Sequence, residues 1–214
     1  MKVTEAMRAR SSIRAFKPDN VDRKLLMEIF EEAARTPSWA NSQPWEVFVA
    51  DGEPLKRILA EYAKNYENKL TGAPERARPT GWPEDIQRRQ GGIGAAMTPE
   101  IKESFSQFGI LNQTMFGAPS VIFLCMDKAL TEWSMYDVGA YSQSVMLLAT
   151  ERGLSTIPAV TAVLFPEVLH RELNIPEHFH VVIGIAIGYA DETNTINKLR
   201  TLRDPAADVV RFVD

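Results

Sequence analysis

Three arginines and two serines lie close together in the stretch RARSSIRAF, residues 8–16. A guanidinium group binds a tetrahedral oxyanion through paired N–H donors, and a serine hydroxyl adds a further hydrogen bond. Arg10, Ser11, Ser12 and Arg14 are therefore candidates to bind a phosphate group. The alternative interpretation is that these side chains are simply solvated near one end of the sequence.

A second polar stretch, PSWANSQPW at residues 37–45, could bind a flat heterocycle. Ser38, Asn41 and Gln43 offer hydrogen-bond donors and acceptors, and two prolines stiffen the loop and reduce the entropy lost on ordering it. The same residues are also typical of an ordinary turn after the end of a helix. Taken alone, this stretch leaves both interpretations open.

Signatures of several other chemistries are missing from the sequence. GGIGAAM at residues 91–97 does not fit the dinucleotide-binding pattern, and there is no phosphate-binding GxxxxGK[ST] and no GxSxG nucleophile motif. A zinc site needs about four ligands close together. His178 and His180 could share one face of a strand, but neither His170 nor the single Cys125 lies at a ligand spacing from them. We therefore predict no metal site, and no motif indicates a catalytic acid, base or nucleophile.

The composition indicates one ordinary globular domain. The chain has 214 residues, a hydrophobic content of 45% and a net charge of −4. Such a charge disfavours nucleic acids and anionic membranes as partners. The longest apolar runs, such as residues 121–126, are too short to cross a bilayer, and a cytoplasmic location is expected.

Hydrophobic periodicity predicts helices that alternate with short strands. The first two helices are expected to begin at caps formed by Thr4 and Asp22, and the second to end before Pro37. Further helices are predicted over residues 54–69, 99–116, 134–153 and 166–173, and strands over residues 46–50, 120–126, 154–158 and 180–190. This order indicates an α/β or α+β sandwich around one mixed sheet.

Two segments fall outside this pattern. Residues 72–99 are rich in proline, glycine and arginine, and we predict a long variable loop or a lid there. Residues 191–214 form a polar C-terminal extension without strong periodicity.

RSSIRAF at residues 10–16, followed by PSWANSQPW, resembles the FMN-dependent nitroreductase family. Asp137 and Gly139, Gly153 and Pro158, GYAD at residues 188–191 and the Arg203–Pro205 segment fit the same pattern. The likeness is greater to the subgroup that acts on nitrobenzene or nitrobenzoate, and it covers nearly the whole chain except residues 72–99. It implies an α+β fold, an α/β/α sandwich with a central mixed, mostly antiparallel sheet, in an intertwined homodimer with FMN at the subunit interface.

The resemblance also implies roles for individual residues. The FMN phosphate would be bound by Arg10, Ser11, Ser12, Arg200 and Arg203, and Arg14 would lie near N1 and O2 of the flavin ring. The loop that reaches the flavin from the other subunit would contribute Pro37, Ser38, Trp39, Asn41 and Gln43. The turn that covers one ring face and donates a backbone N–H to N5 would consist of Pro158, Ala159 and Val160. Some relatives have a glutamate in place of Val160.

The implied activity is ping-pong electron transfer. NADH or NADPH would pass a hydride to flavin N5, and a flat, electron-poor acceptor such as a nitroaromatic would then take the electrons. Trp39, Trp82 and Phe116 are candidates to line the acceptor slot, and for each of them a core or loop-packing role is the alternative. The alternatives are a reductase of the same fold for quinones, enones or halogenated aromatics, and a flavin-binding module without turnover.

Overall fold

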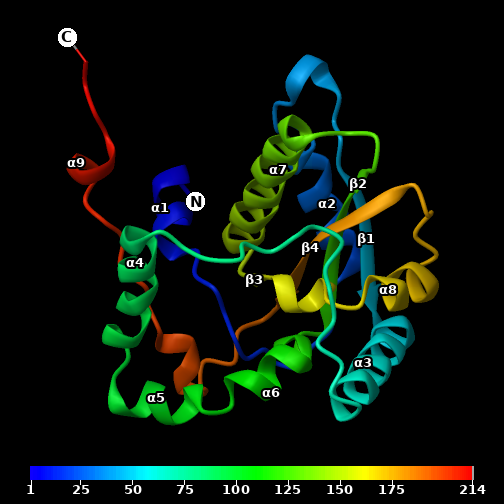
Figure 1. The fold of residues 1–214 in the computed structure, drawn as a ribbon, viewed down its shortest axis with the longest axis horizontal. Helices are drawn as coiled ribbons and strands as arrows, with labels where there is room; N and C mark the ends of the chain where they lie inside the picture. Colours follow the sequence, from blue (N-terminus) through cyan, green and yellow to red (C-terminus); the bar gives the residue numbers. More distant parts are fainter. Residues whose placement is uncertain (214) are drawn as a thin grey trace.

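The computed structural model describes residues 1–213, which form a four-stranded antiparallel sheet with helices on both faces (Figure 1). The strand order is β1-β2-β4-β3. The strands are β1 (Glu46–Asp51), β2 (Ser120–Asp127), β3 (Ser155–Ala159) and β4 (Phe179–Gly188). All four coincide closely with the apolar runs from which they are predicted, because a strand covered on both faces has few polar positions.

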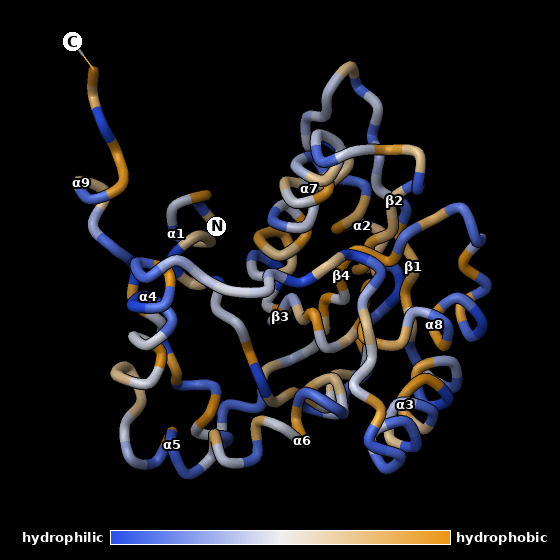
Figure 2. Tube along the Cα trace, in the orientation of Figure 1, coloured by the Kyte–Doolittle hydropathy of each residue, from blue (hydrophilic) through white to orange (hydrophobic). Residues whose placement is uncertain are grey.

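Two hydrophobic cores lie on opposite faces of the sheet. One face is covered by α3 (Gly52–Glu67) and α8 (Pro166–Leu173), and the other by α2 (Arg23–Ala33) and α7 (Glu132–Glu151). The apolar colouring of β2 and β4 in Figure 2 marks the sheet between these cores. No helix in residues 1–213 is both long enough and apolar enough to cross a membrane.

The predicted fold class is confirmed, and the structure specifies how the strands pair. The four strands pair only antiparallel to one another. Within residues 1–213 the parallel element of the sheet is an isolated bridge between Ser12 and Thr156. This bridge brings the N-terminal arginine and serine stretch beside β3.

A glycine in β4 allows a short 3₁₀ helix, η3 (Val160–Val163), to lie directly against the sheet. A Cβ atom at Gly184 would lie 2.6 Å from the Cβ of Ala162, closer than two carbon atoms approach in folded proteins. The hydroxyl of Tyr62 in α3 donates to the carbonyl of Ala162 at 2.8 Å. These contacts fix the turn that begins at Pro158.

The first helix, α1 (Val3–Ala9), lies where a helix is predicted, but a different residue caps it. Lys2 occupies the cap position instead of Thr4, and the Glu5 carboxylate accepts a hydrogen bond from the Lys2 N–H at 2.9 Å. The predicted cap of α2 is confirmed, since the Asp22 carboxylate accepts from the Lys24 N–H at 2.8 Å. Local hydrogen bonding by Glu5 therefore moves the start of α1 by two residues.

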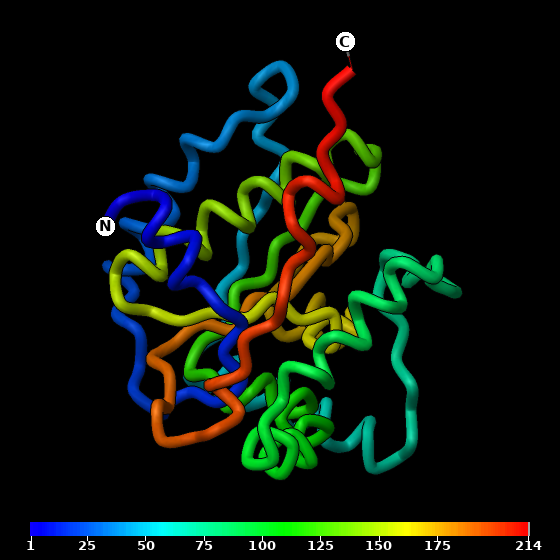
Figure 3. The backbone as a smooth tube through the Cα atoms, turned by 90° about the vertical axis from the view of Figure 1, so that its left-hand side faces the viewer, coloured from blue at the N-terminus to red at the C-terminus, as the bar shows by residue number. Residues whose placement is uncertain are grey.

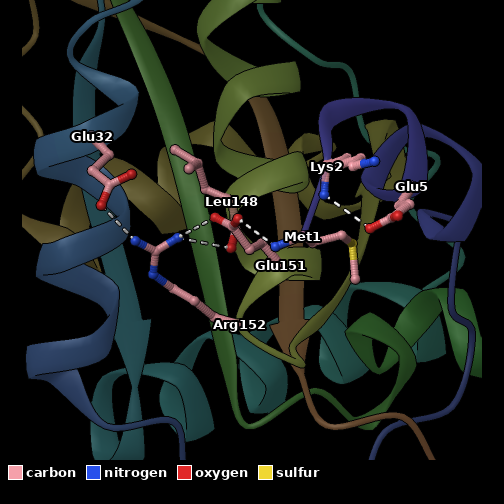
Figure 4. Close-up of polar contacts among 7 residues, drawn as sticks. All are labelled: Met1, Lys2, Glu5, Glu32, Leu148, Glu151 and Arg152. Atoms are coloured by element: carbon pink, nitrogen blue, oxygen red, sulfur yellow. Dashed lines mark hydrogen bonds and ion pairs between the residues drawn. The ribbon is translucent and has the colours of Figure 1, made fainter.

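Ionic contacts tie the start of the chain to α7 (Figure 4). The Met1 amino group lies 3.1 Å from the carboxylate of Glu151, the last residue of α7. Arg152 pairs with Glu32 of α2 at 2.7 Å and with Glu151 at 3.3 Å. These contacts, together with the packing of α1 on α7, position the arginines that follow α1.

Residues 72–99, predicted as a variable loop or lid insertion, include a helix. They contain α4 (Glu84–Ala95), which has no buried side chain and three glycines. Glycine lowers helix propensity, and a helix without an apolar face gives no periodic signal, so the pattern could not reveal it. Arg88 and Arg89 of α4 both donate to the Asp204 carboxylate, at 2.8 and 2.7 Å, and hold α4 against the C-terminal segment.

The single helix predicted over residues 99–116 is divided in the structure. It consists of α5 (Pro99–Phe105), α6 (Phe108–Gln113) and the 3₁₀ turn η2 (Met115–Gly117). Met115, Phe116 and Gly117 all have positive φ angles, which a continuous α-helix does not contain. The remaining short helices are η1 (Trp39–Asn41), η4 (Thr195–Lys198) and α9 (Ala206–Val209).

Replacing Glu75 by glutamine should destabilise the fold. The Glu75 side chain is 15% exposed, accepts from the Val181 N–H at 2.6 Å and faces His170 at 3.3 Å. Burial alone would raise its pKa, but these two partners together hold the pKa of Glu75 below its ordinary value. We expect a loss of about 1.5–3 kcal/mol at neutral pH, the range for hydrogen bonds to charged groups.

Urea denaturation between pH 7 and pH 3 measures this effect. A carboxylate with a lowered folded-state pKa stabilises the protein above its ordinary pKa and loses that contribution as the pH falls through the folded value. The difference between wild type and Glu75→Gln should therefore shrink below about pH 4.5. Glu177→Gln is the control, because Glu177 lines the same surface pocket as Glu75. An equal loss in the control, or a difference that grows towards pH 3, contradicts the prediction.

Candidate anion-binding and cofactor site

A cavity of about 260 Å³ lies between the end of α1 and the segment that follows η4. Figure 3 shows the N-terminal and C-terminal segments passing side by side at this point. We call it the arginine cavity, and it is lined by Met7, Arg8, Arg10, Ser11, Ser12, Arg14, Leu199, Arg200, Thr201 and Arg203. The structure therefore brings together all six residues predicted to contact the phosphate and the ring edge.

The arginine cavity is strongly electropositive. Five arginines line it, and within residues 1–213 none of the five pairs with a carboxylate within 4.0 Å. Burial, followed by repulsion from Arg203, lowers the pKa of Arg10. Burial also lowers the pKa of Arg14. The arrangement is one that an anion would stabilise.

Hydrogen bonds to the backbone hold three of these side chains in place. Arg14 Nη1 donates to the Ser12 carbonyl at 2.9 Å, and Arg200 Nη1 donates to the Asn197 carbonyl at 2.8 Å. Arg203 Nη1 donates to the Leu202 carbonyl at 2.9 Å. Each guanidinium keeps further N–H groups available for a ligand.

A buried amide joins the two chain segments of the cavity. Asn197 Oδ1 accepts from the N–H groups of Arg14 and Ala15, at 2.7 and 3.1 Å. Its Nδ2 donates to the carbonyls of Ala15 and Asp191, at 2.7 and 2.9 Å. Asn197 carries no motif of its own, so its role depends on a long-range contact that sequence reasoning missed.

The turn predicted to cover the flavin lies next to the same stretch. The Ile13 N–H donates to the Thr156 carbonyl at 3.1 Å, and β3 continues from Thr156 to Pro158 and Ala159. Val160 follows at the start of η3 and is 45% exposed. Two buried polar atoms here, Arg14 Nε and Thr156 Oγ1, have no hydrogen-bond partner within residues 1–213.

The third predicted group, residues 37–43, lies elsewhere on the chain. Pro37, Ser38 and Trp39 line an open groove of about 360 Å³ together with Trp133, Tyr136 and Asp137, and we call it the aromatic groove. Among the residues that the structure describes, none from 37 to 43 lines the arginine cavity. Within one chain, the predicted site residues therefore form two separate groups.

Hydrogen bonds fix the shape of this loop. The Asp137 carboxylate accepts from the Trp39 N–H at 3.0 Å, and the Ser38 hydroxyl accepts from the Gln43 N–H at 2.9 Å. Asn41 and Gln43 both have positive φ angles. The loop is a preformed turn held against α7.

Sequence reasoning missed some residues of the cavity, and of the two roles open for Phe116 the structure gives the core role. Met7, Arg8, Leu199 and Thr201 line the arginine cavity without having been predicted to do so. Phe116, predicted to line an acceptor slot, is only 2% exposed and belongs to the core beneath α3. Within residues 1–213, no three His, Cys, Asp or Glu side chains gather closely enough to hold a metal ion.

Comparisons with known proteins agree with this geometry. The Nitroreductase family pattern matches residues 7–189. The chain is 32% identical over 211 residues to the 4-nitrobenzoate reductase of Pseudomonas putida, covering 96% of this chain and 92% of that protein. It is 26% identical over 212 residues to Nitroreductase NfnB of Mycolicibacterium smegmatis, covering 96% of this chain and 90% of that protein.

A solved structure has the same fold over its full length. The crystal structure of the FMN and NADPH-dependent nitroreductase NfnB from Sphigopyxis sp. strain HMH has a TM-score of 0.91 and 30% sequence identity, over 100% of both chains. This likeness extends through residues 72–99, to which no family motif was assigned. The chain belongs to the nitroreductase family.

Proposed function

We propose that this protein is an FMN-dependent oxidoreductase that uses NADH or NADPH to reduce a flat, electron-poor acceptor such as a nitroaromatic compound. The arginine cavity is the observation that carries this proposal. It lies at the motif through which the chain resembles FMN-binding nitroreductases, and five arginines line it, none of which pairs with a carboxylate in the described part of the chain. FMN, when bound, supplies the hydride-transfer chemistry, and the protein supplies position and charge.

The residues present fit a flavin phosphate. Burial, and after it repulsion from Arg203, lowers the pKa of Arg10, so the charge of Arg10 is poorly compensated without an anion. A phosphate dianion bound by both would remove that repulsion and accept several charge-assisted hydrogen bonds. Ser11, Ser12 and Arg200 are further partners for the same phosphate in this proposal.

Arg14 and the 158–160 turn would serve the flavin ring. Arg14 is half-buried, and its buried Nε has no partner within the described residues, so an acceptor on a ligand would satisfy it. A fixed positive charge at the ring edge favours the more negative, reduced form of the cofactor. Pro158, Ala159 and Val160 would cover one ring face, with a backbone N–H directed to N5.

A homodimer explains why the predicted site residues lie in two groups. Residues 37–43 lie in the aromatic groove and would reach the flavin of a second copy. Trp39, Trp133 and Tyr136 are 68%, 69% and 78% exposed, which is a large apolar surface for a monomer. Two such chains related by a two-fold axis would bury both grooves and complete two flavin sites.

The comparisons support the choice of reductant and acceptor class. One relative is named a 4-nitrobenzoate reductase, and a structural neighbour of 30% identity is described as FMN and NADPH-dependent. We therefore propose a nitroaromatic acceptor, with quinones, enones and halogenated aromatics as competing acceptors.

In this proposal the whole chain is one domain, with a variable insertion at residues 72–99 and a C-terminal extension at residues 191–214. The enzyme works in the cytoplasm.

Anaerobic mixing tests the proposal. Protein loaded with FMN is mixed with NADH or with NADPH, and the flavin absorbance near 450 nm is followed. We expect bleaching within seconds and recovery of the colour when 4-nitrobenzoate or nitrobenzene is added. Flavin that stays oxidised with both nucleotides would identify a binding module without turnover. Recovery only with quinones, enones or halogenated aromatics would identify a different acceptor class.

A further inference from the structure

We propose that Phe108 is a positioning residue for Arg14. Its ring holds the Arg14 guanidinium at the wall of the arginine cavity and thereby sets how strongly the protein favours reduced over oxidised FMN. This inference rests on the proposed function. It adds a residue from α6 that no sequence motif includes.

Few contacts determine where the Arg14 guanidinium lies. Its Cζ atom lies 5.9 Å from the centroid of the Phe108 ring, within the range of a cation–π interaction. Nη1 donates to the Ser12 carbonyl, and Nε is buried without a partner in residues 1–213. Within the same residues no carboxylate lies within 4.0 Å of this guanidinium, so the ring face and one carbonyl are the groups that compensate its charge.

Phe108 is itself held firmly. It stacks on Phe105 with ring centroids 4.5 Å apart and planes inclined by 8°, and it lies 6.3 Å from Phe116 of the core. Its carbonyl accepts from Asn112 Nδ2 at 2.9 Å, and Asn112 Oδ1 accepts from Thr161 Oγ1 at 3.0 Å. The ring is therefore fixed relative to the 158–160 turn as well as to Arg14.

The backbone of Arg14 does not depend on Phe108. The Arg14 N–H donates to Asn197, and the neighbouring Ile13 N–H donates to β3. Shortening the Phe108 side chain should therefore release the Arg14 side chain and leave the main chain in place. A change in the flavin then reports on the position of the guanidinium.

The test compares Phe108→Leu with Phe105→Leu in the FMN-loaded protein. Both variants lose one ring of the same stacked pair, but only Phe108 faces Arg14. We measure the midpoint potential of the bound flavin and the dissociation constant of oxidised FMN. Phe108→Leu should reduce the preference for reduced FMN about tenfold, which lowers a two-electron potential by about 30 mV. Phe105→Leu should cause less than half of that shift.

A conservative variant and a measurement without flavin complete the test. Phe108→Trp should restore the potential, because indole is the strongest cation–π partner. In the FMN-free protein, NMR should show Arg14 side-chain protons shifted upfield by the ring current, and this shift should vanish in Phe108→Leu and persist in Phe105→Leu. An unchanged potential in Phe108→Leu, equal shifts in both leucine variants, or no upfield shift in the wild type would overturn the inference.

Failure of the proposed function would look different. If the wild-type protein binds no FMN at all, the proposed function is wrong and the potential cannot be measured. The ring-current shift in the FMN-free protein then still decides whether Phe108 positions Arg14.

Discussion

Replacing Arg10 by alanine is expected to weaken FMN binding roughly 10- to 150-fold, because hydrogen bonds to charged groups contribute about 1.5–3 kcal/mol. Arg10 lines the arginine cavity close to Arg203, and no carboxylate within residues 1–213 neutralises it. Its guanidinium is therefore available to a phosphate. Quenching of FMN fluorescence on titration with protein measures the change in dissociation constant.

The same variant should not destabilise the protein in the absence of FMN. Burial and repulsion from Arg203 lower the pKa of Arg10, so its charge is unfavourable while no anion is bound. Arg10→Ala should leave the free energy of unfolding of the FMN-free protein unchanged or raise it. A residue that merely supports the fold would show the opposite result.

Arg23→Ala is the matched control for charge. The Arg23 side chain is 80% exposed and pairs with Asp51 at 2.6 Å, at the end of β1. Removing it deletes one positive charge without touching the arginine cavity, so FMN affinity should be unchanged. Equal FMN affinities in wild type and Arg10→Ala would show that the phosphate binds elsewhere.

Replacing Trp133 by glutamate is expected to convert a dimer into monomers and to abolish tight FMN binding. Trp133 lies in the aromatic groove, where it packs edge-on against Trp39 with ring centroids 6.1 Å apart. A carboxylate buried in an apolar interface costs several kcal/mol, enough to shift dimerisation by two or more orders of magnitude. FMN affinity should fall with it, because each flavin site would lose the 37–43 loop of the second copy.

Sedimentation at several protein concentrations measures the dissociation into monomers, and FMN titration measures the loss of FMN affinity. Met27→Glu places the same charge at an exposed apolar position of α2 outside the groove and serves as the control. We expect Met27→Glu to remain dimeric and to bind FMN normally. A wild-type monomer that binds FMN tightly, or a Trp133→Glu dimer, would contradict the dimer proposal.

The strands and their order along the chain could be predicted because their signal is local. β2 and β4 are almost continuous apolar runs, and Asp22 caps α2 through a contact two residues away. The helix α4 could not be predicted, because its three glycines lower helix propensity and none of its side chains is buried. Its bonds from Arg88 and Arg89 reach Asp204, far along the sequence. The break between α5 and α6 falls at Ser106 and Gln107, where no proline or glycine marks it in the sequence.

The residues of the site likewise divide into those that could be predicted from the sequence and those that could not. The RSSIR stretch is informative alone, because arginine and serine together are typical of an anion site. Its encounter with Arg200 and Arg203 was predicted only through the family resemblance. Asn197 and Phe108 were not predicted at all, because a lone amide and a lone aromatic residue carry no signal until the fold brings them to Arg14.

A crystal structure of the protein with FMN tests the central claim most directly. We predict that the phosphate lies in the arginine cavity, within hydrogen-bond distance of the Arg10 and Arg203 guanidinium groups. A phosphate located at another place, with the arginine cavity filled only by solvent, would contradict the account.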